Sequence, residues 1–111
     1  MLQKEWRISR GKEYSYIYTN GLRISGKYMI VFIIRNSLSH NRFGIVTSKK
    51  VGNAVTRNRA KRRIREVIRK NLDLLPSGYD IVIVARFNTK EANFALIEKD
   101  YVKLMRKAST Y

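Results

Sequence analysis

The sequence contains no cysteine and few acidic residues, and both shortages limit what the protein can be. Without cysteine it can form neither a disulfide framework nor a thiolate metal site, so an intracellular protein is expected. Only eight Asp and Glu stand against 24 Lys and Arg, which gives a formal net charge of +16. Such a charge opposes compaction unless polyanions neutralise it, and nucleic acid is the obvious polyanion.

Long apolar runs are also missing. The longest, "YMIVFII" at residues 28–34, is far below the roughly 18 residues that suggest a membrane span. The opening "MLQKEWRISRG" lacks the apolar region of a signal peptide. We therefore expect a cytoplasmic protein with no membrane partner. A chain of 111 residues fits one domain, in which residues 1–10 are expected to be a flexible N-terminal segment.

The first half of the chain predicts one helix followed by three strands. Tyr14, Ile17 and Tyr18 have helical spacing, which indicates a helix over residues 13–19 that stops at Gly21. Strands are expected at residues 22–24, 28–35 and 43–48. The second lacks alternation and is expected to be buried on both faces, and the third to return antiparallel after a polar loop.

The second half predicts two helices separated by one strand. The basic helix comes first, and "PSG" at residues 76–78 follows it. A buried strand is then expected at residues 80–86. Asn88 with Glu91 resembles a capping box for a final helix, whose apolar stripe runs from Phe94 to Ala108. The order αβββαβα predicts a single α+β domain with helices covering a four-stranded sheet, in which the basic helix could connect a parallel pair.

The basic helix carries the strongest functional signal. "KKVGNAVTRNRAKRRIREVIRK", residues 49–70, opposes ten Lys and Arg with one acid, Glu66. At about 100° per residue, its apolar residues fall on one side, and Asn58, Arg62, Arg65 and Arg69 fall on the other. Ordinary solvated helices interleave acids to gain pairs worth about 0.2–0.5 kcal/mol each, whereas this one repels itself. The pattern predicts a polyanion-binding face.

The residue types suit RNA. Arginine offers a planar fork of donors to phosphate oxygens and can stack on bases, while lysine supplies a mobile point charge. Asn53 and Asn58 add neutral donors and acceptors that can contact a phosphate, a 2′-hydroxyl or a hydrated metal held by RNA.

No self-sufficient catalytic or metal site is predicted. His40 is the only histidine and lies in a polar loop, without a second candidate ligand close in sequence. Glu98 and Asp100 are two positions apart on a helix, so they make a poor acid–base or metal pair.

A family resemblance adds to this reading. "SKKVGNAVTRNRAKRRIRE", residues 48–66, resembles the signature of the bacterial ribonuclease P protein subunit, including its "RNR" core at residues 57–59. An aromatic helix, "YMIVFIIRN", "RFGIVTSKK", "GYDIVIVAR" and a C-terminal helix follow the family's order. The resemblance implies a two-layer sandwich, ribosomal protein S5 domain 2-like, with a left-handed βαβ crossover.

The resemblance also implies partners. In this family the catalytic RNA of ribonuclease P, with bound Mg²⁺, removes the 5′ leader from precursor tRNA, while the protein helps to bind the substrate. Mg²⁺ held mainly by the RNA is thus the expected cofactor. No catalytic protein residue, metal ligand, organic cofactor or small-molecule substrate is expected.

Two sets of site residues carry over by position. Those expected to bind the catalytic RNA are Lys49, Lys50, Asn53, Arg57, Asn58, Arg59, Lys61, Arg62 and Arg65. Those expected to form a cleft for the single-stranded leader are Tyr14, Tyr18 and Phe32. Aromatic rings stack on unpaired bases at about 1–3 kcal/mol per base, although ordinary core packing is the alternative for each ring. Val46 stands at a cleft-facing position where some members carry a small polar residue.

Three other classes fit the composition less well. A structural RNA-binding protein of ribosomal type would share the charge and the basic helix, and only the pattern from Asn53 to Arg65 together with the aromatic helix argues against it. A helix-turn-helix DNA-binding protein would need a helix just before the basic one. A protein nuclease would need clustered carboxylates or histidines.

Overall fold

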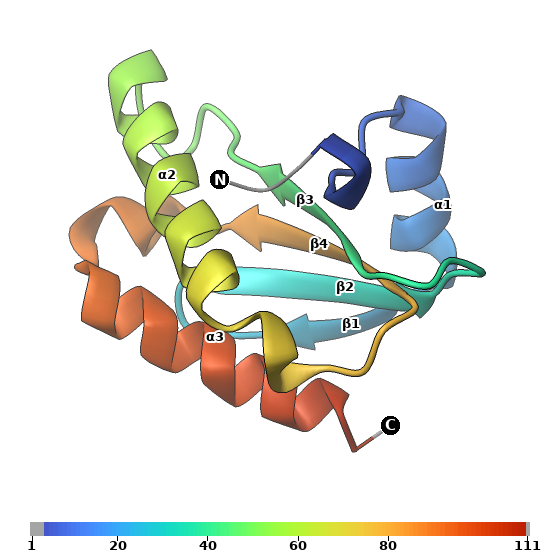
Figure 1. Ribbon diagram of the computed structural model, residues 1–111. Helices are drawn as coiled ribbons and strands as arrows, with labels where there is room; N and C mark the ends of the chain where they lie inside the picture. The colour runs from blue at the N-terminus through green and yellow to red at the C-terminus, as the bar shows by residue number, and fades with distance from the viewer. Residues whose placement is uncertain (1–3, 111) are drawn as a thin grey trace.

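The computed structural model describes residues 4–110 and has the predicted order of elements (Figure 1). Its helices are α1 (Gly11–Asn20), α2 (Ala54–Lys70) and α3 (Phe94–Ala108). Its strands are β1 (Leu22–Ser25), β2 (Met29–Arg35), β3 (Arg42–Val46) and β4 (Tyr79–Ala85). Short 3₁₀ turns are η1 (Lys4–Trp6), η2 (Leu72–Leu74) and η3 (Phe87–Glu91). None of the helices between residues 4 and 110 has the length and hydrophobicity of a membrane span.

The four strands form one mixed sheet in the order β1-β2-β4-β3. β4 is antiparallel to β2 and parallel to β3, so the expected parallel pair around the basic helix is confirmed. The expectation that β3 returns antiparallel is correct for its direction but wrong for a hairpin with β2, because β4 lies between them. Ile81, Val82 and Ile83 of β4 are fully buried, which suits a central strand.

The connection from β3 through α2 to β4 has an uncommon hand. In Figure 1, α2 lies in front of the sheet, β3 and β4 point to the left, and the chain passes from the upper strand down to the lower one. This is the left-handed crossover that the resemblance implies, in contrast to the right-handed connections of nearly all βαβ units.

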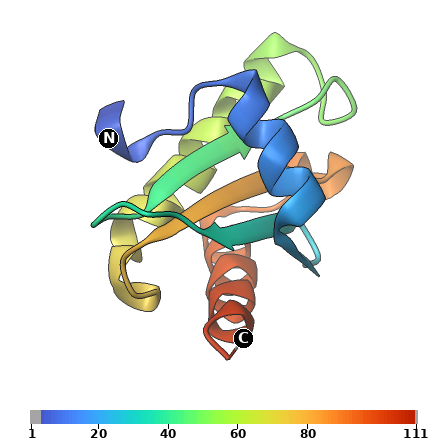
Figure 2. The same cartoon turned by 90° about the vertical axis from the view of Figure 1, so that its right-hand side faces the viewer.

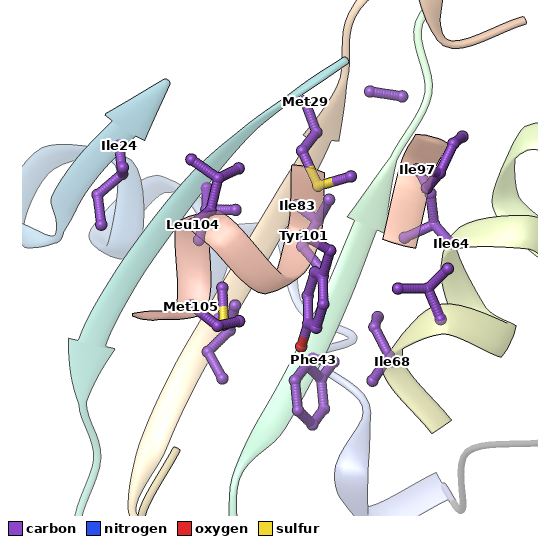
Figure 3. Close-up of a cluster of buried hydrophobic side chains, with 14 of the residues drawn as sticks. Ile24, Met29, Phe43, Ile64, Ile68, Ile83, Ile97, Tyr101, Leu104 and Met105 are labelled. Atoms are coloured by element: carbon purple, nitrogen blue, oxygen red, sulfur yellow. The ribbon is translucent and has the colours of Figure 1, made fainter. Parts of the chain in front are cut away.

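One face of the sheet is closed by α2 and α3. Met29 and Val31 of β2 are fully buried there, and Ile64 and Ile68 of α2 pack into the same cluster. Figure 3 shows Tyr101 of α3 between the strands and α2, with its hydroxyl directed toward Phe43. Burial raises the pKa of Tyr101. These two layers form the predicted sandwich.

The opposite face is covered only in part, by α1 (Figure 2). Ile17 of α1 is buried against Val82, whereas Ile30, Phe32 and Ile34 of β2 are only half-buried. The expectation that β2 is buried on both faces is therefore wrong, because α1 is too short to cover the whole sheet.

Side-chain caps set the starts of the two long helices. Asn53 Oδ1 accepts a hydrogen bond from the Thr56 amide (2.9 Å), and Asn93 Oδ1 accepts one from the Leu96 amide (3.0 Å). The capping box expected at Asn88 is wrong, because residues 87–91 form η3 and the Asn88 amide donates to the Lys27 carbonyl (3.1 Å).

Residues 4–10, part of the segment expected to be flexible, lie along β3. Arg7 forms a parallel bridge with Phe43, and the Ile8 amide donates to the Phe43 carbonyl (2.9 Å). Ile8 is buried, and Trp6 packs partly against the main core. This segment covers part of the free edge of β3, an edge that would otherwise invite another strand. Residues 1–3 lie outside the described part.

Candidate nucleic-acid interface

The cationic face of α2 lies opposite its buried face. Ala60, Ile64, Val67 and Ile68 are buried, as their spacing predicts. On the outer side, Asn58, Arg59 and Arg62 are exposed, and Arg57, Lys61 and Arg65 are half-buried.

Most cations of α2 have no carboxylate partner, because Glu66 is the one acidic residue of this helix. Glu66 pairs with Arg69, and this guanidinium lowers the pKa of the Glu66 carboxyl. Within residues 4–110, the other ion pairs all belong to Arg42. The predicted cations of α2 are thus free of carboxylate partners in this part of the chain, which leaves their charge available for an external polyanion.

Arg63, which is absent from the predicted set, has an internal role. Its Nη1 donates to the Ala92 carbonyl (2.9 Å), which ties α2 to the end of η3. Arginines of one basic helix therefore divide between holding the fold and facing outward.

The loop between β3 and α2 presents the remaining cations of the set. Lys49 and Lys50 are exposed, while Val51 is fully buried and anchors the loop. Gly52 has φ +147°, a conformation that other residues rarely adopt. The oxygen of Asn53 accepts the capping bond of α2, and its amide nitrogen is left to donate to a partner.

The structure brings the three predicted aromatic residues together. Tyr14 and Tyr18 of α1 have ring centroids 6.4 Å apart, and Tyr18 meets Phe32 of β2 edge-to-face at 4.9 Å. Tyr18 is 40% exposed, so an incoming base can reach its ring. Burial raises the pKa of Tyr14 and of Tyr18, with a further contribution at Tyr14 from Tyr18 and Glu13, so both phenols stay neutral beside phosphate.

An apolar row of the sheet extends this aromatic cluster. The strand register places Ile30, Val84 and Val46 side by side on the face that carries Phe32. All three are half-buried, and Val84 and Val46 pack with Tyr14 and Phe32 around the α1 cluster, while Ile30 is the register partner of Val84. We call these six residues, Tyr14, Tyr18, Phe32, Ile30, Val84 and Val46, the aromatic cleft, after the leader cleft that the resemblance predicts. Ile30 and Val84 were missed from sequence because only the strand order reveals them as neighbours of Val46.

Gly44 of β3 makes room for one wall of the cleft. A Cβ there would lie 2.5 Å from the Tyr14 hydroxyl oxygen, which is too close for two non-bonded atoms. The Tyr14 hydroxyl donates to the Ile8 carbonyl (3.0 Å), so the ring lies across β3 and is held at its far end.

The aromatic cleft and the basic helix meet across β3. A hollow of about 130 Å³ is bounded by Tyr14 and Gly44 on one side and by Lys61 and Arg65 of α2 on the other. Tyr14 of the aromatic cleft and the α2 cations Lys61 and Arg65 therefore lie beside the same hollow.

A partly buried ion-pair network holds α1 against the sheet. Arg42 of β3 donates to both carboxylate oxygens of Asp80 on β4 (2.9 and 2.6 Å), and it pairs with Glu13 of α1 (2.7 Å). Asn36 also donates to Asp80 (2.8 Å). These bonds raise the pKa of Arg42. In the sequence, an acidic residue at the start of a buried strand indicates that Asp80 needs a partner. The identity of that partner, Arg42, depends on the β3–β4 register.

The carboxylates considered as catalytic candidates take part in internal bonds. Glu98 accepts from the Asn71 amide (3.0 Å), and Asp100 accepts from the backbone amides of Lys27 and Tyr28 (3.0 and 2.8 Å). His40 lies 3.0 Å from the Glu5 carbonyl. Within residues 4–110, no three His, Cys, Asp or Glu side chains gather as metal ligands would.

A half-exposed aromatic cleft beside unpaired cations defines a class, that of proteins that bind single-stranded and folded RNA. Comparison with known proteins narrows it. The sequence profile of the ribonuclease P family matches residues 2–109. The ribonuclease P protein component of Syntrophomonas wolfei is 40% identical over 111 residues, which cover all of this chain and 93% of that protein. This chain belongs to the family of ribonuclease P protein components.

Solved structures agree with this membership. The RNase P protein of Staphylococcus aureus is 31% identical with a TM-score of 0.85, and the match covers 93% of this chain and 94% of that one. The protein from Thermotoga maritima is 28% identical with a TM-score of 0.83, and the match covers 91% and 96% of the two chains.

Proposed function

We propose that this protein, as the RNA-binding subunit of ribonuclease P, holds the catalytic RNA with α2 and the 5′ leader of precursor tRNA in the aromatic cleft. Family membership supports the role in tRNA processing. The main support for placing the leader and the catalytic RNA on neighbouring surfaces is the hollow at β3. It has Tyr14 on one side and Lys61 and Arg65 on the other.

The cleft suits a leader of any sequence. Tyr18 and Phe32 offer ring faces and edges for stacking, and Val84, Val46 and the adjoining Ile30 offer apolar contact, and neither depends on base identity. Mature tRNA lacks the leader and cannot use these contacts. The protein therefore raises the affinity for precursor over product.

The cations of α2 act on the RNA side. They neutralise phosphates with release of counterions, which lowers the Mg²⁺ concentration needed to offset repulsion between RNA and substrate. We assign the cleavage chemistry to the RNA and its bound Mg²⁺, in the cytoplasm. The protein's own part is to bind and orient the RNA strands.

The test is cleavage of precursor tRNA by a bacterial ribonuclease P RNA at low Mg²⁺, with and without the protein. We expect the protein to stimulate cleavage, and we expect the double variant Arg57→Ala, Arg62→Ala to abolish this stimulation. Lys4→Ala with Lys12→Ala is the control, since it removes two exposed cations away from α2 and should leave stimulation intact. Binding without stimulation by the unaltered protein would favour a structural RNA-binding protein of ribosomal type.

A further inference from the structure

A second group of lysines borders a hollow on α3, away from the interface described above. Lys27 of the β1–β2 turn and Lys99 and Lys103 of α3 surround a space of about 180 Å³, together with Tyr28 and Leu96. All three lysines are exposed. We call Lys27, Lys99 and Lys103 the α3 basic patch. α3 covers the closed face of the sheet, whereas the aromatic cleft lies on the other face.

The patch is held together by a specific contact between distant segments. The carboxylate of Asp100 accepts hydrogen bonds from the amides of Lys27 (3.0 Å) and Tyr28 (2.8 Å). Asp100 adjoins Lys99 and lies three residues before Lys103. The contact that fixes the turn against α3 therefore also places Lys27 beside the two helix lysines.

The acids of α3 do not neutralise these lysines by ion pairs. Glu98 bonds to Asn71 on the side toward α2, and Asp100 is occupied by the two turn amides. Ion pairs within residues 4–110 involve Arg42 and Arg69 and none of the patch. Asp100 still contributes a negative charge at the base of the hollow, so the three lysines leave it with a net positive charge.

Helix stability does not account for the arrangement. Lys99 and Lys103 are four residues apart, a spacing at which like charges destabilise a helix. Arg106 and Lys107 lie in the last turn, where the helix dipole favours cations, but Lys99 and Lys103 precede that turn. The ammonium group of Lys27 lies 5.4 Å from the centre of the Tyr28 ring, and this cation–π contact stabilises one of the three charges.

We infer that the α3 basic patch binds backbone phosphates of the RNA subunit, at a segment separate from the one that α2 contacts. This inference rests on the proposed function. Lysine ammonium groups suit phosphates as point charges and read no base sequence. In the proposed function the leader lies on the other face of the sheet and α2 contacts the RNA subunit, so we assign the α3 basic patch to the RNA subunit rather than to the leader.

The first experiment measures how the affinity of the protein for ribonuclease P RNA alone depends on salt. Each phosphate contact contributes about 0.7–0.9 to the slope of log K against log salt. The variant Lys27→Gln, Lys99→Gln, Lys103→Gln should lower the slope by about 2 and weaken binding about ten- to hundredfold near 0.1 M salt. Lys4→Gln, Arg10→Gln, Lys12→Gln removes the same charge elsewhere and should keep the slope.

Equal loss of slope in both variants would overturn the inference, since net charge alone would then explain it. A change that appears only when precursor tRNA is added would overturn the assignment to the RNA subunit. Cleavage at low Mg²⁺ separates the two proposals. If the unaltered protein stimulates cleavage while the patch variant keeps its slope, the inference fails and the proposed function stands.

The second experiment uses the absence of cysteine. A single cysteine at Lys99→Cys or at Arg62→Cys can carry a photoactivated crosslinker without competing thiols. We expect crosslinks from the two positions to separate segments of the RNA subunit in the holoenzyme. A single shared segment, or no crosslink from position 99 beside an efficient one from position 62, would contradict the inference.

Discussion

The two faces of the sheet are built from the same strands but differ in how far they are covered. On β2, Met29 and Val31 point to α2 and α3 and are fully buried, whereas Ile30 and Phe32 point to the α1 side and are half-buried. The closed face is one continuous buried cluster, and the open face leaves the rings of Tyr14 and Phe32 only half-buried. The comparison teaches that stability comes mainly from one face, and that incomplete cover on the other leaves a binding surface.

The largest effect is expected from a cavity on the closed face. Ile83 of β4 is fully buried among β2, α2 and α3, so Ile83→Ala should lower the free energy of unfolding by about 2–5 kcal/mol. Urea denaturation measures this loss. RNA affinity of the folded fraction should remain unchanged. A loss of affinity with unaltered stability would contradict the division between the faces.

Removal of the Arg42 network should cost nearly as much. Arg42→Met leaves Asp80 as an unpaired, buried carboxylate, so we expect a loss of about 3 kcal/mol and a looser α1. The same denaturation experiment checks the loss. Asp80→Asn in the Arg42→Met background should restore part of it, because the uncompensated charge is gone. No restoration would show that the charge is not the cause.

Truncation of a ring in the aromatic cleft should act on binding rather than on stability. Tyr18→Ala removes a half-exposed ring, and we expect the holoenzyme to bind precursor tRNA about 1–3 kcal/mol less tightly, with mature tRNA unaffected. Tyr16→Ala is the matched control, because Tyr16 is exposed on the same helix but lies outside the cleft. Equal losses of affinity for precursor and mature tRNA would contradict the placement of the leader in the cleft.

The smallest effect should come from a valine-to-threonine substitution on the open face, and the same substitution on the closed face serves as its comparison. Val46→Thr adds a hydroxyl that solvent can reach, so stability should change by less than about 0.5 kcal/mol while the preference among leader bases shifts. Val31→Thr buries its hydroxyl on the closed face and should cost about 1–3 kcal/mol. Thermal melts and competition between leaders measure the two outcomes, and equal destabilisation would show that both faces are closed.

Local patterns predicted the elements well because periodicity and turn residues act over short distances. The helical spacing of Ala60, Ile64, Val67 and Ile68 identified the buried side of α2, and hence its cationic side. The capping box failed at Asn88 because a 3₁₀ turn and Asn93 compete for the same stretch, which a local motif cannot resolve. The end of β3 at Val46 also came two residues before the expected one.

Long-range pairing explains what the sequence could not predict. The insertion of β4 between β2 and β3 places Val84 beside Val46, and it brings Arg42 to Asp80. No spacing in the chain encodes either pair. The resemblance supplied the aromatic positions 14, 18 and 32, but the reason that Tyr14 can lie across β3 is Gly44, which has no signature of its own.

The central claim is that the open face holds the leader beside the RNA bound by α2. The most direct measurement is crosslinking from a photoactivated probe on Tyr18→Cys, in the holoenzyme with precursor tRNA labelled in its leader. The account predicts crosslinks to leader nucleotides of the bound precursor. Crosslinks confined to the RNA subunit or to the mature part of the tRNA would contradict it.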